Sequence, residues 1–162
     1  MADVYLDTSA LVKRYIQEPG TVAVDVIFDR ASDGSLTIAT SAWNMGEAFG
    51  VFNHRRVRKL LTEHEFRVAV QSLIGEFLRL IGTGALQVHP VRVSLLMETW
   101  PLVLSQHLYQ ADALQIATCN GSQSKVLITS DERLRRASEE VGLRALDPHK
   151  QESDVRGLFE SC

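Results

Sequence analysis

The sequence predicts an α/β fold in which a mostly parallel sheet of about five strands is flanked by helices. Short apolar runs rich in β-branched residues alternate along the chain with longer segments of helical period. This alternation is typical of parallel sheets whose strands are connected by helices. The chain has 162 residues, of which 45% are apolar and 23% charged, so it is long and apolar enough for one domain with its own core.

Five short runs are predicted as the strands of this sheet. Each combines apolar and β-branched residues over three or four positions. They are Val4-Tyr5-Leu6, Leu36-Thr37-Ile38-Ala39, Leu86-Gln87-Val88, Val126-Leu127-Ile128 and Arg144-Ala145-Leu146. Because helical segments separate them, we expect neighbouring strands to run parallel.

The clearest predicted helix lies over residues 62–81. Thr62 and Glu65 form a capping box ahead of an apolar stripe, and a Gly-Thr-Gly stretch ends the pattern. A proline should kink or divide the helix predicted over 91–108, because Pro101 lies inside it. Other helices are expected to begin near Ser9, Thr21, Ser41, Val91, Ala111 and Ser130.

The sequence predicts one domain over residues 1–148 and a polar C-terminal tail over 149–162, with no linker or repeat within the domain. No apolar run approaches the ~18 residues of a membrane span, and no signal peptide is expected. Cys119 and Cys162 lie far apart and outside any zinc-binding spacing. A reduced, cytoplasmic protein is the simplest interpretation.

Missing motifs exclude several common classes of enzyme. No GxGxxG follows a strand and no GxxxxGK[ST] occurs, so dinucleotide and P-loop sites lack support. GxSxG and HExxH are also absent. The net charge of −3 argues against a generic basic nucleic-acid binder. Four acids held by metal ions would nevertheless leave the rest of the protein slightly positive, so the net charge does not decide the partner.

Two carboxylates occupy unexpected positions on predicted helices. Glu47 lies in a helix that is apolar nearly all round, which predicts that this helix is largely buried. Burying a carboxylate costs several kcal/mol unless it is paired or bound to metal, and a salt bridge from elsewhere in the fold is an equal alternative. Asp112 lies on the apolar stripe of another helix, near its start, where the helix dipole alone would account for it.

Two further acids, Asp7 and Asp131, each follow a predicted strand. A helix N-cap is the commoner role of a single Asp at such a position. Both nevertheless lie at the carboxyl ends of strands, where open α/β sheets bind their ligands. Carboxylates forced close together repel one another unless a cation lies between them, and hard oxygen ligands favour Mg²⁺ or Mn²⁺. Together with Glu47 and Asp112, these acids lead to the hypothesis of a four-carboxylate metal site.

Four short motifs around these acids are spread along the chain. They are Tyr5-Leu6-Asp7-Thr8-Ser9 followed by Glu18-Pro19-Gly20, Asn44-Met45-Gly46-Glu47, Ala111-Asp112-Ala113-Leu114-Gln115 and Thr129-Ser130-Asp131. In this order they resemble the PIN-domain nucleases, and their spacing is similar to that of VapC-like toxins of type II toxin–antitoxin pairs. The resemblance covers almost the whole chain. One departure is at His107-Leu108-Tyr109-Gln110, where many relatives carry an arginine.

The resemblance implies a PIN-like α/β fold and a metal-dependent endoribonuclease. Its catalytic and metal-binding residues would be Asp7, Glu47, Asp112 and Asp131, around one or two Mg²⁺ or Mn²⁺ ions. Ser9 and Thr129 are expected to orient the carboxylates, a role that is compatible with capping. Basic residues near these motifs are candidates for contact with the RNA substrate, although solvated surface charge is their default role: Lys13, Arg14, Arg55 and Arg133.

Two other functions and two partners stay open at this point. Asp7 could be the acceptor of a Mg²⁺-assisted phosphotransfer domain, although Ser9 stands where a haloacid-dehalogenase-like pattern has a second Asp. The chain could also be a PIN-fold protein-binding module. The resemblance implies a cognate antitoxin, and a homodimer is also expected. Apolar residues of the first helices could serve these contacts, with core packing as the simpler explanation: Val12, Tyr15, Ile16, Val24, Ile27 and Phe28.

Overall fold

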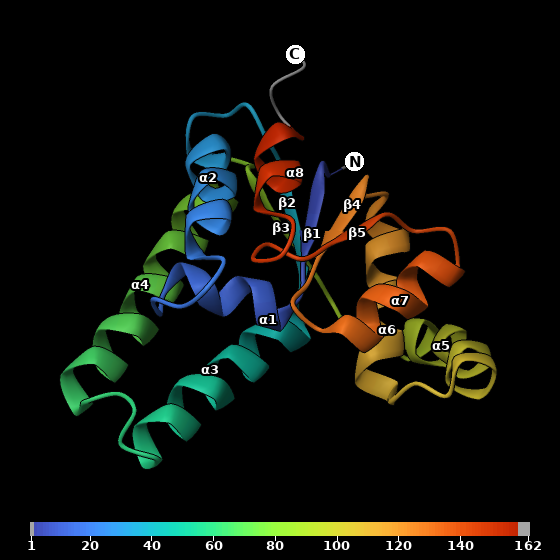
Figure 1. The fold of residues 1–162 in the computed structure, drawn as a ribbon, viewed down its shortest axis with the longest axis horizontal. Coiled ribbons are helices and arrows are strands. Elements are labelled where there is room, and N and C mark those ends of the chain that lie inside the picture. The colour runs from blue at the N-terminus through green and yellow to red at the C-terminus, as the bar shows by residue number, and fades with distance from the viewer. Residues whose placement is uncertain (1, 159–162) are drawn as a thin grey trace.

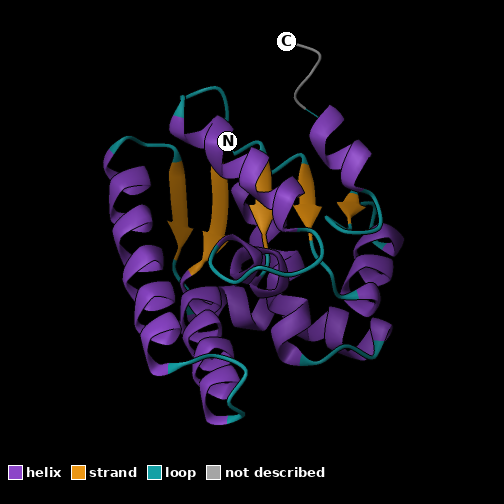
Figure 2. Ribbon diagram, turned by 60° about the vertical axis from the view of Figure 1, so that its left-hand side comes forward, coloured by secondary structure: helices purple, strands orange, loops and turns teal. Residues whose placement is uncertain are grey.

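The computed structural model describes residues 2–158 and folds them around one five-stranded sheet (Figure 1). The strands are β1 (Val4–Leu6), β2 (Ile38–Ser41), β3 (Leu86–His89), β4 (Val126–Ile128) and β5 (Ala145–Leu146). Their order across the sheet is β3-β2-β1-β4-β5, and all neighbouring strands are parallel, as the common direction of the arrows in Figure 2 shows. The predicted fold class is therefore confirmed.

The second strand lies further along the chain than its apolar pattern predicts. Thr37 is held outside the strand by Asp3, whose carboxylate accepts a hydrogen bond from the Thr37 backbone N–H at 3.0 Å. The strand instead extends through Thr40 and Ser41, both fully buried. The Thr40 hydroxyl is satisfied there because it donates to the Leu6 carbonyl at 2.9 Å. Buried polar strand residues of this kind leave no apolar signal in the sequence.

Helices cover both faces of the sheet, and the alternation of strand side chains creates two cores. Val4 and Leu6 of β1 belong to one core, and Tyr5 between them belongs to the other. The helical elements are α1 (Thr8–Leu11), the 3₁₀ turn η1 (Val12–Arg14), α2 (Thr21–Ser32), α3 (Ala42–Val57), α4 (Glu63–Gly82), α5 (Val93–Gln106), α6 (Gln110–Ser122), α7 (Glu132–Glu140) and α8 (Glu152–Gly157). Figure 1 shows α2, α4 and α8 on one side of the sheet and α5, α6 and α7 on the other.

Two predictions about helices have opposite outcomes. The capping box of α4 is confirmed, because the Thr62 hydroxyl accepts from the Glu65 N–H while the Glu65 carboxylate accepts from the Thr62 N–H. The expected division of α5 is wrong, since the helix continues through Pro101. Proline removes the hydrogen bond to the carbonyl four residues earlier, that of Met97. Met97 is half exposed, so this turn of the helix faces solvent.

The apolar residues of the first helices pack inside the protein. Val24, Ile27 and Phe28 are fully buried, Val12 and Ile16 nearly so, and Tyr15 packs edge-on against Phe28. Core packing, the simpler of the two explanations, thus accounts for these residues, of which Tyr15 alone is partly exposed. Large exposed apolar side chains recur instead at helical spacing along α5: Val93, Met97, Trp100 and Leu104.

The last described helix, α8, packs against α2 and contributes Val155 to the core. It falls in the segment 149–162 that the sequence assigns to a tail, whose boundary at residue 148 stays a prediction; residues 159–162 lie outside the described residues. Over residues 2–158, every helix is too short or too polar to cross a lipid bilayer.

Candidate active site

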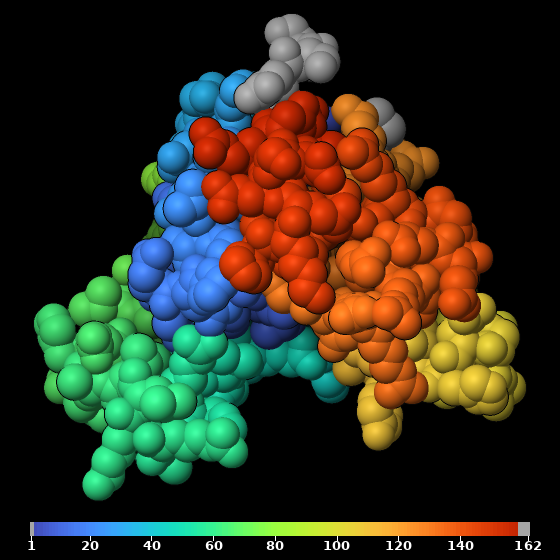
Figure 3. Space-filling model, viewed as in Figure 1, coloured from blue at the N-terminus to red at the C-terminus, as the bar shows by residue number. Residues whose placement is uncertain are grey.

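The four predicted acids line one cavity at the carboxyl end of the sheet. Asp7 directly follows β1 and Asp131 lies just beyond β4, while Glu47 and Asp112 belong to α3 and α6. The cavity has a volume of about 510 Å³, and all four acids form part of its wall. In Figure 3 the surface is hollowed between α3 and the lobe formed by α5, α6 and α7, where this cavity lies.

The strand order explains why these acids meet. Strands β2 and β3 lie on one side of β1, whereas β4 and β5 lie on the other, so the order of the strands reverses between β1 and β4. Open α/β sheets form a crevice at such a reversal, outside the carboxyl ends of the strands. Asp7 and Asp131 follow the two strands at this point, and α3 and α6 bring their acids to it.

Asp7 is the most enclosed of the four acids, with 4% of its surface exposed. Its Oδ1 accepts from the Ala10 N–H at 2.8 Å and thereby caps α1. The Ser9 hydroxyl donates to Oδ1 at 2.8 Å, and the Thr129 hydroxyl donates to Oδ2 at 2.6 Å. Burial raises the pKa of Asp7 to about 6 against the lowering effect of these hydrogen bonds, and the charge of Asp131 adds to the rise. The charged form of Asp7 is therefore costly in the absence of a cation.

Asp112 and Asp131 lie in the first turn and at the N-cap of their helices. Asp131 Oδ1 accepts from the Arg133 N–H at 2.8 Å and so caps α7. Asp112 is half-buried in α6, and this burial raises its pKa. The negative charges of Asp131 and Glu47 raise the pKa of Asp112 further, while the charge of Arg133 lowers it. Helix capping is thus compatible with a place on the cavity wall.

Glu47 is half-buried, because α3 is more exposed than its apolar sequence predicts. Trp43, Gly46 and Gly50 on this helix are exposed, so the expected burial on nearly all sides is wrong. The physical reason is that α3 contacts mainly α1 and α4 and leaves its remaining surface open. The Thr8 hydroxyl donates to Glu47 Oε2 at 2.5 Å and holds this carboxylate beside the segment that carries Asp7.

No cationic side chain within residues 2–158 forms an ion pair with any of these four carboxylates. Over the same residues, no three Asp, Glu, His or Cys side chains lie close enough together to bind one ion directly. The donors are hard oxygens, and Mg²⁺ typically binds one or two carboxylates and retains several waters. The cavity thus offers oxygen donors of the kind that such an ion takes, without a cluster among the described residues that would bind it through side chains alone.

A network of buried polar side chains lies next to the cavity, and the sequence analysis does not predict it. The Asn44 side-chain amide donates to the Leu6 carbonyl at 3.0 Å, and the Gln115 amide donates to Asn44 Oδ1 at 2.6 Å. The Tyr5 hydroxyl donates to Gln115 Oε1 at 2.8 Å. This network joins α3, α6 and β1, the elements that carry or precede three of the four acids.

The network residues do carry a signal in the sequence. Asn44 lies three residues before Glu47 and Gln115 three residues after Asp112, so each shares a helical face with its acid. Polar residues that share a helical face with an acid indicate a cluster of hydrogen-bonded polar side chains rather than an apolar core. His54, an exposed residue of α3, also lines the cavity.

Three of the four basic residues considered for RNA contact are already paired with acids. Lys13, itself buried, contacts Glu18 at 2.8 Å, and Arg55 contacts the other oxygen of the same carboxylate. Arg14 pairs with carboxylates of α2 and α4. Across residues 2–158, Arg133 is the one member of this set without a carboxylate partner.

Known proteins of the same fold share this architecture. PAE2754 from Pyrobaculum aerophilum is similar with a TM-score of 0.67 and 17% identity, over 99% of this chain and 98% of that one. VapC20 from Mycobacterium tuberculosis, a sarcin–ricin loop cleaving toxin, has a TM-score of 0.62 and 14% identity, over 87% and 96%. FitAcB from Neisseria gonorrhoeae has a TM-score of 0.61 and 16% identity, over 90% and 97%. At these identities the likeness shows the fold.

The family follows from the sequence itself. No curated protein matches the chain significantly. The profile of the PIN domain, however, matches residues 4–140, a range that contains all four acids of the cavity. Because this match covers most of the sequence, the chain belongs to the PIN-domain family.

Proposed function

We propose that this protein is an endoribonuclease that hydrolyses RNA phosphodiester bonds with Mg²⁺ or Mn²⁺. The observation that carries the proposal is the single cavity lined by four carboxylates from four parts of the chain, none of which is paired with a cation within residues 2–158. Carboxylates gathered around one cavity repel one another, and a divalent cation that binds there relieves this repulsion. PIN domains are generally nucleases and typically use divalent metals, which supports the same conclusion.

Each acid has a defined part in this proposal. Asp7 and Asp112 are the direct ligands, and Glu47 and Asp131 contact the ion directly or through water. The Ser9 and Thr129 hydroxyls hold the Asp7 carboxylate in place, and Ser9 Oγ in turn accepts from the Ser130 N–H at 2.8 Å. When bound, the ion would lower the pKa of a coordinated water and offset negative charge that develops on the phosphate.

We further propose that the protein is the toxin of a toxin–antitoxin pair and acts in the cytoplasm. The shared fold with VapC20, a sarcin–ricin loop cleaving toxin, supports both RNA as the substrate and the toxin role. A cognate antitoxin and a second copy of the chain are the proposed partners. Exposed apolar side chains suited to such contacts lie along α4 and α5.

Metal removal tests the proposed activity. The purified protein is incubated with single-stranded RNA in Mg²⁺, in Mn²⁺ or in EDTA, and products are followed on a denaturing gel. We expect cleavage with either metal and none above the protein-free control in EDTA, because no side chain replaces the ion that activates water. Cleavage at an undiminished rate in EDTA would contradict the proposal.

A further inference from the structure

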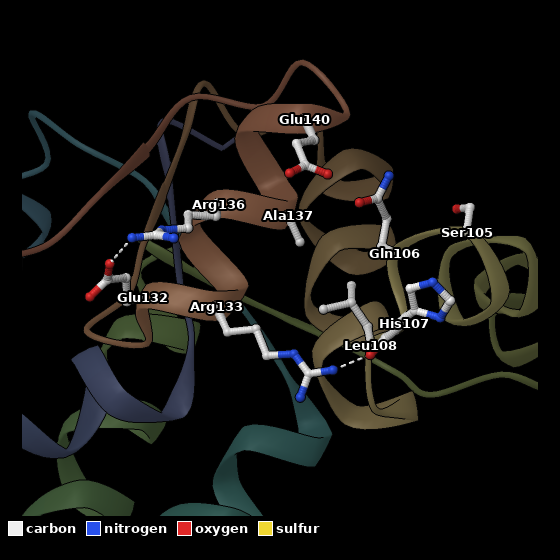
Figure 4. A pocket seen from close by; sticks show the side chains of 9 residues that line it. All are labelled: Ser105, Gln106, His107, Leu108, Glu132, Arg133, Arg136, Ala137 and Glu140. Carbon is white, nitrogen blue, oxygen red and sulfur yellow. Dashed lines mark hydrogen bonds and ion pairs between the residues drawn. The ribbon is translucent and has the colours of Figure 1, made fainter.

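A second cavity, with a volume of about 610 Å³, lies between α7 and the end of α5 (Figure 4). The end of α5 and the linker that follows it form one wall, with residues 105–108, and α7 forms the other. The two cavities meet at the first turn of α7: Asp131 and Leu134 line the acidic cavity, whereas Glu132 and Arg133 line the second. A polymer whose scissile bond lies beside the four acids can therefore continue into the second cavity.

Arg133 stands at the boundary between the two cavities. Its guanidinium donates a hydrogen bond to the His107 carbonyl, as Figure 4 shows, and has no carboxylate partner within residues 2–158. A neutral carbonyl is a weaker partner for guanidinium than a phosphate oxygen, which accepts charge-assisted hydrogen bonds. Arg133 is thus free to exchange this carbonyl for an anionic ligand.

An exposed aromatic ring lies against the same guanidinium. The Arg133 guanidinium carbon is 5.2 Å from the centre of the Tyr109 ring, and 73% of Tyr109 is exposed. Tyr109 is the N-cap of α6 and lies three residues before Asp112. Exposed aromatic side chains beside basic residues are the surfaces on which bases of single-stranded nucleic acid stack. The ring and the cation thus lie together beside the second cavity, which Arg133 lines.

We propose that the second cavity with Tyr109 at its edge binds a nucleotide of single-stranded RNA next to the scissile bond. Tyr109 stacks on the base, and Arg133 contacts a phosphate. Arg136 lines the same cavity but is paired with Glu132, so Arg133 is the cation that a phosphate would contact. The cavity volume lies in the range of about 300–1,000 Å³ that is usual for small-ligand sites. This assignment rests on the proposed nuclease function, because it extends the substrate site of that activity.

Single-stranded RNA is favoured over a duplex by the kind of contact available. A stacking platform needs a base whose face is free, and paired bases inside a duplex are already stacked on their neighbours. A duplex would offer Arg133 its phosphates but would leave Tyr109 unused. We therefore expect loops and single-stranded segments to bind more tightly than double-stranded RNA of the same sequence.

Binding of a fluorescein-labelled single-stranded RNA oligonucleotide, measured by anisotropy in EDTA, tests the subsite without cleavage. We expect Tyr109→Ala to weaken binding about tenfold, in the usual range for losing one stacking contact. Arg133→Gln should weaken binding by about the same factor, because it removes a charge-assisted contact to a phosphate. Tyr109→Phe keeps the ring and should bind at least about fivefold more tightly than Tyr109→Ala. Arg135→Gln is the matched charge control, because Arg135 lies on the same helix but lines neither cavity, and its affinity should equal that of the wild type.

Cleavage kinetics in Mg²⁺ distinguish a failure of the proposed subsite from a failure of the proposed nuclease function. For Tyr109→Ala we expect a KM about tenfold higher with kcat nearly unchanged, since the ring binds substrate away from the reacting bond. Equal affinity and equal KM for wild type, Tyr109→Ala and Arg133→Gln would overturn the subsite while leaving the nuclease intact. Tyr109-dependent binding without any cleavage by the wild type would instead support the subsite and overturn the proposed nuclease. Thermal unfolding of every variant checks that its fold is retained.

Discussion

Replacing Asp112 with Asn should abolish RNA cleavage without lowering the stability of the fold. Removal of one group that stabilises charge in the transition state commonly lowers kcat by about 10²–10³-fold, and we expect a loss of at least that size. Stability should be unchanged or higher, because burial and the charges of Asp131 and Glu47 disfavour the ionised Asp112 side chain. Cleavage rates in Mg²⁺ and urea denaturation at pH 7 in EDTA measure the two effects.

An exposed acid provides the matched control for this substitution. Asp154→Asn removes the same charge from α8, outside both cavities. We expect its cleavage rate to equal that of the wild type. Wild-type activity of Asp112→Asn would contradict the assigned role, and so would a loss of activity that is fully explained by unfolding.

The stability of the metal-free protein should fall as the pH rises from about 4 to about 6 because of Asp7. The pKa of Asp7 is raised from its ordinary value of 3.8 to about 6, first by burial. Between these values the unfolded chain has released the proton that the folded chain still holds, so rising pH favours unfolding. At 1.36 kcal/mol per pKa unit, the loss is about 3 kcal/mol and is complete above about pH 6.

Other groups titrate in the same range, so the comparison with Asp7→Asn isolates this contribution. The amide cannot ionise, and its side-chain oxygen can still cap α1. Urea denaturation of both proteins at several pH values in EDTA should show the wild type losing stability relative to the variant by about 3 kcal/mol across this interval. A difference that is constant with pH would show that Asp7 titrates normally in the folded protein. Added Mg²⁺ should restore stability to the wild type above pH 6.

Much of the sheet could be predicted because parallel strands are buried on both faces and form continuous apolar runs. Strand β1 and strand β4 are such runs and lie where the sequence places them. Strand β2 was misplaced because Thr40 and Ser41 are buried through hydrogen bonds rather than through apolar character. Helix α5 continues through Pro101 at a turn that faces solvent. The local sequence does not show which side of the helix is exposed.

The sequence singles out the four acids that line one cavity, but it does not reveal which basic residues are already paired. Asp7 and Asp131 could be singled out because strand ends are marked in the sequence, and the strand order then brings them together. The ion pair between Arg14 and Glu76 joins residues 62 positions apart, so no local pattern reveals that Arg14 is already neutralised. The bond from Gln115 to Asn44 spans 71 positions and is hidden for the same reason.

The position of bound Mn²⁺ tests the central claim most directly. Crystals soaked in Mn²⁺ are measured near the manganese absorption edge, and the anomalous difference density locates the ion. We predict a peak in the acidic cavity within direct coordination distance of Asp7 and Asp112, and its loss in crystals of Asp112→Asn. A peak at another place on the protein, or an empty cavity at millimolar Mn²⁺, would contradict the proposal that these carboxylates form a metal-dependent active site.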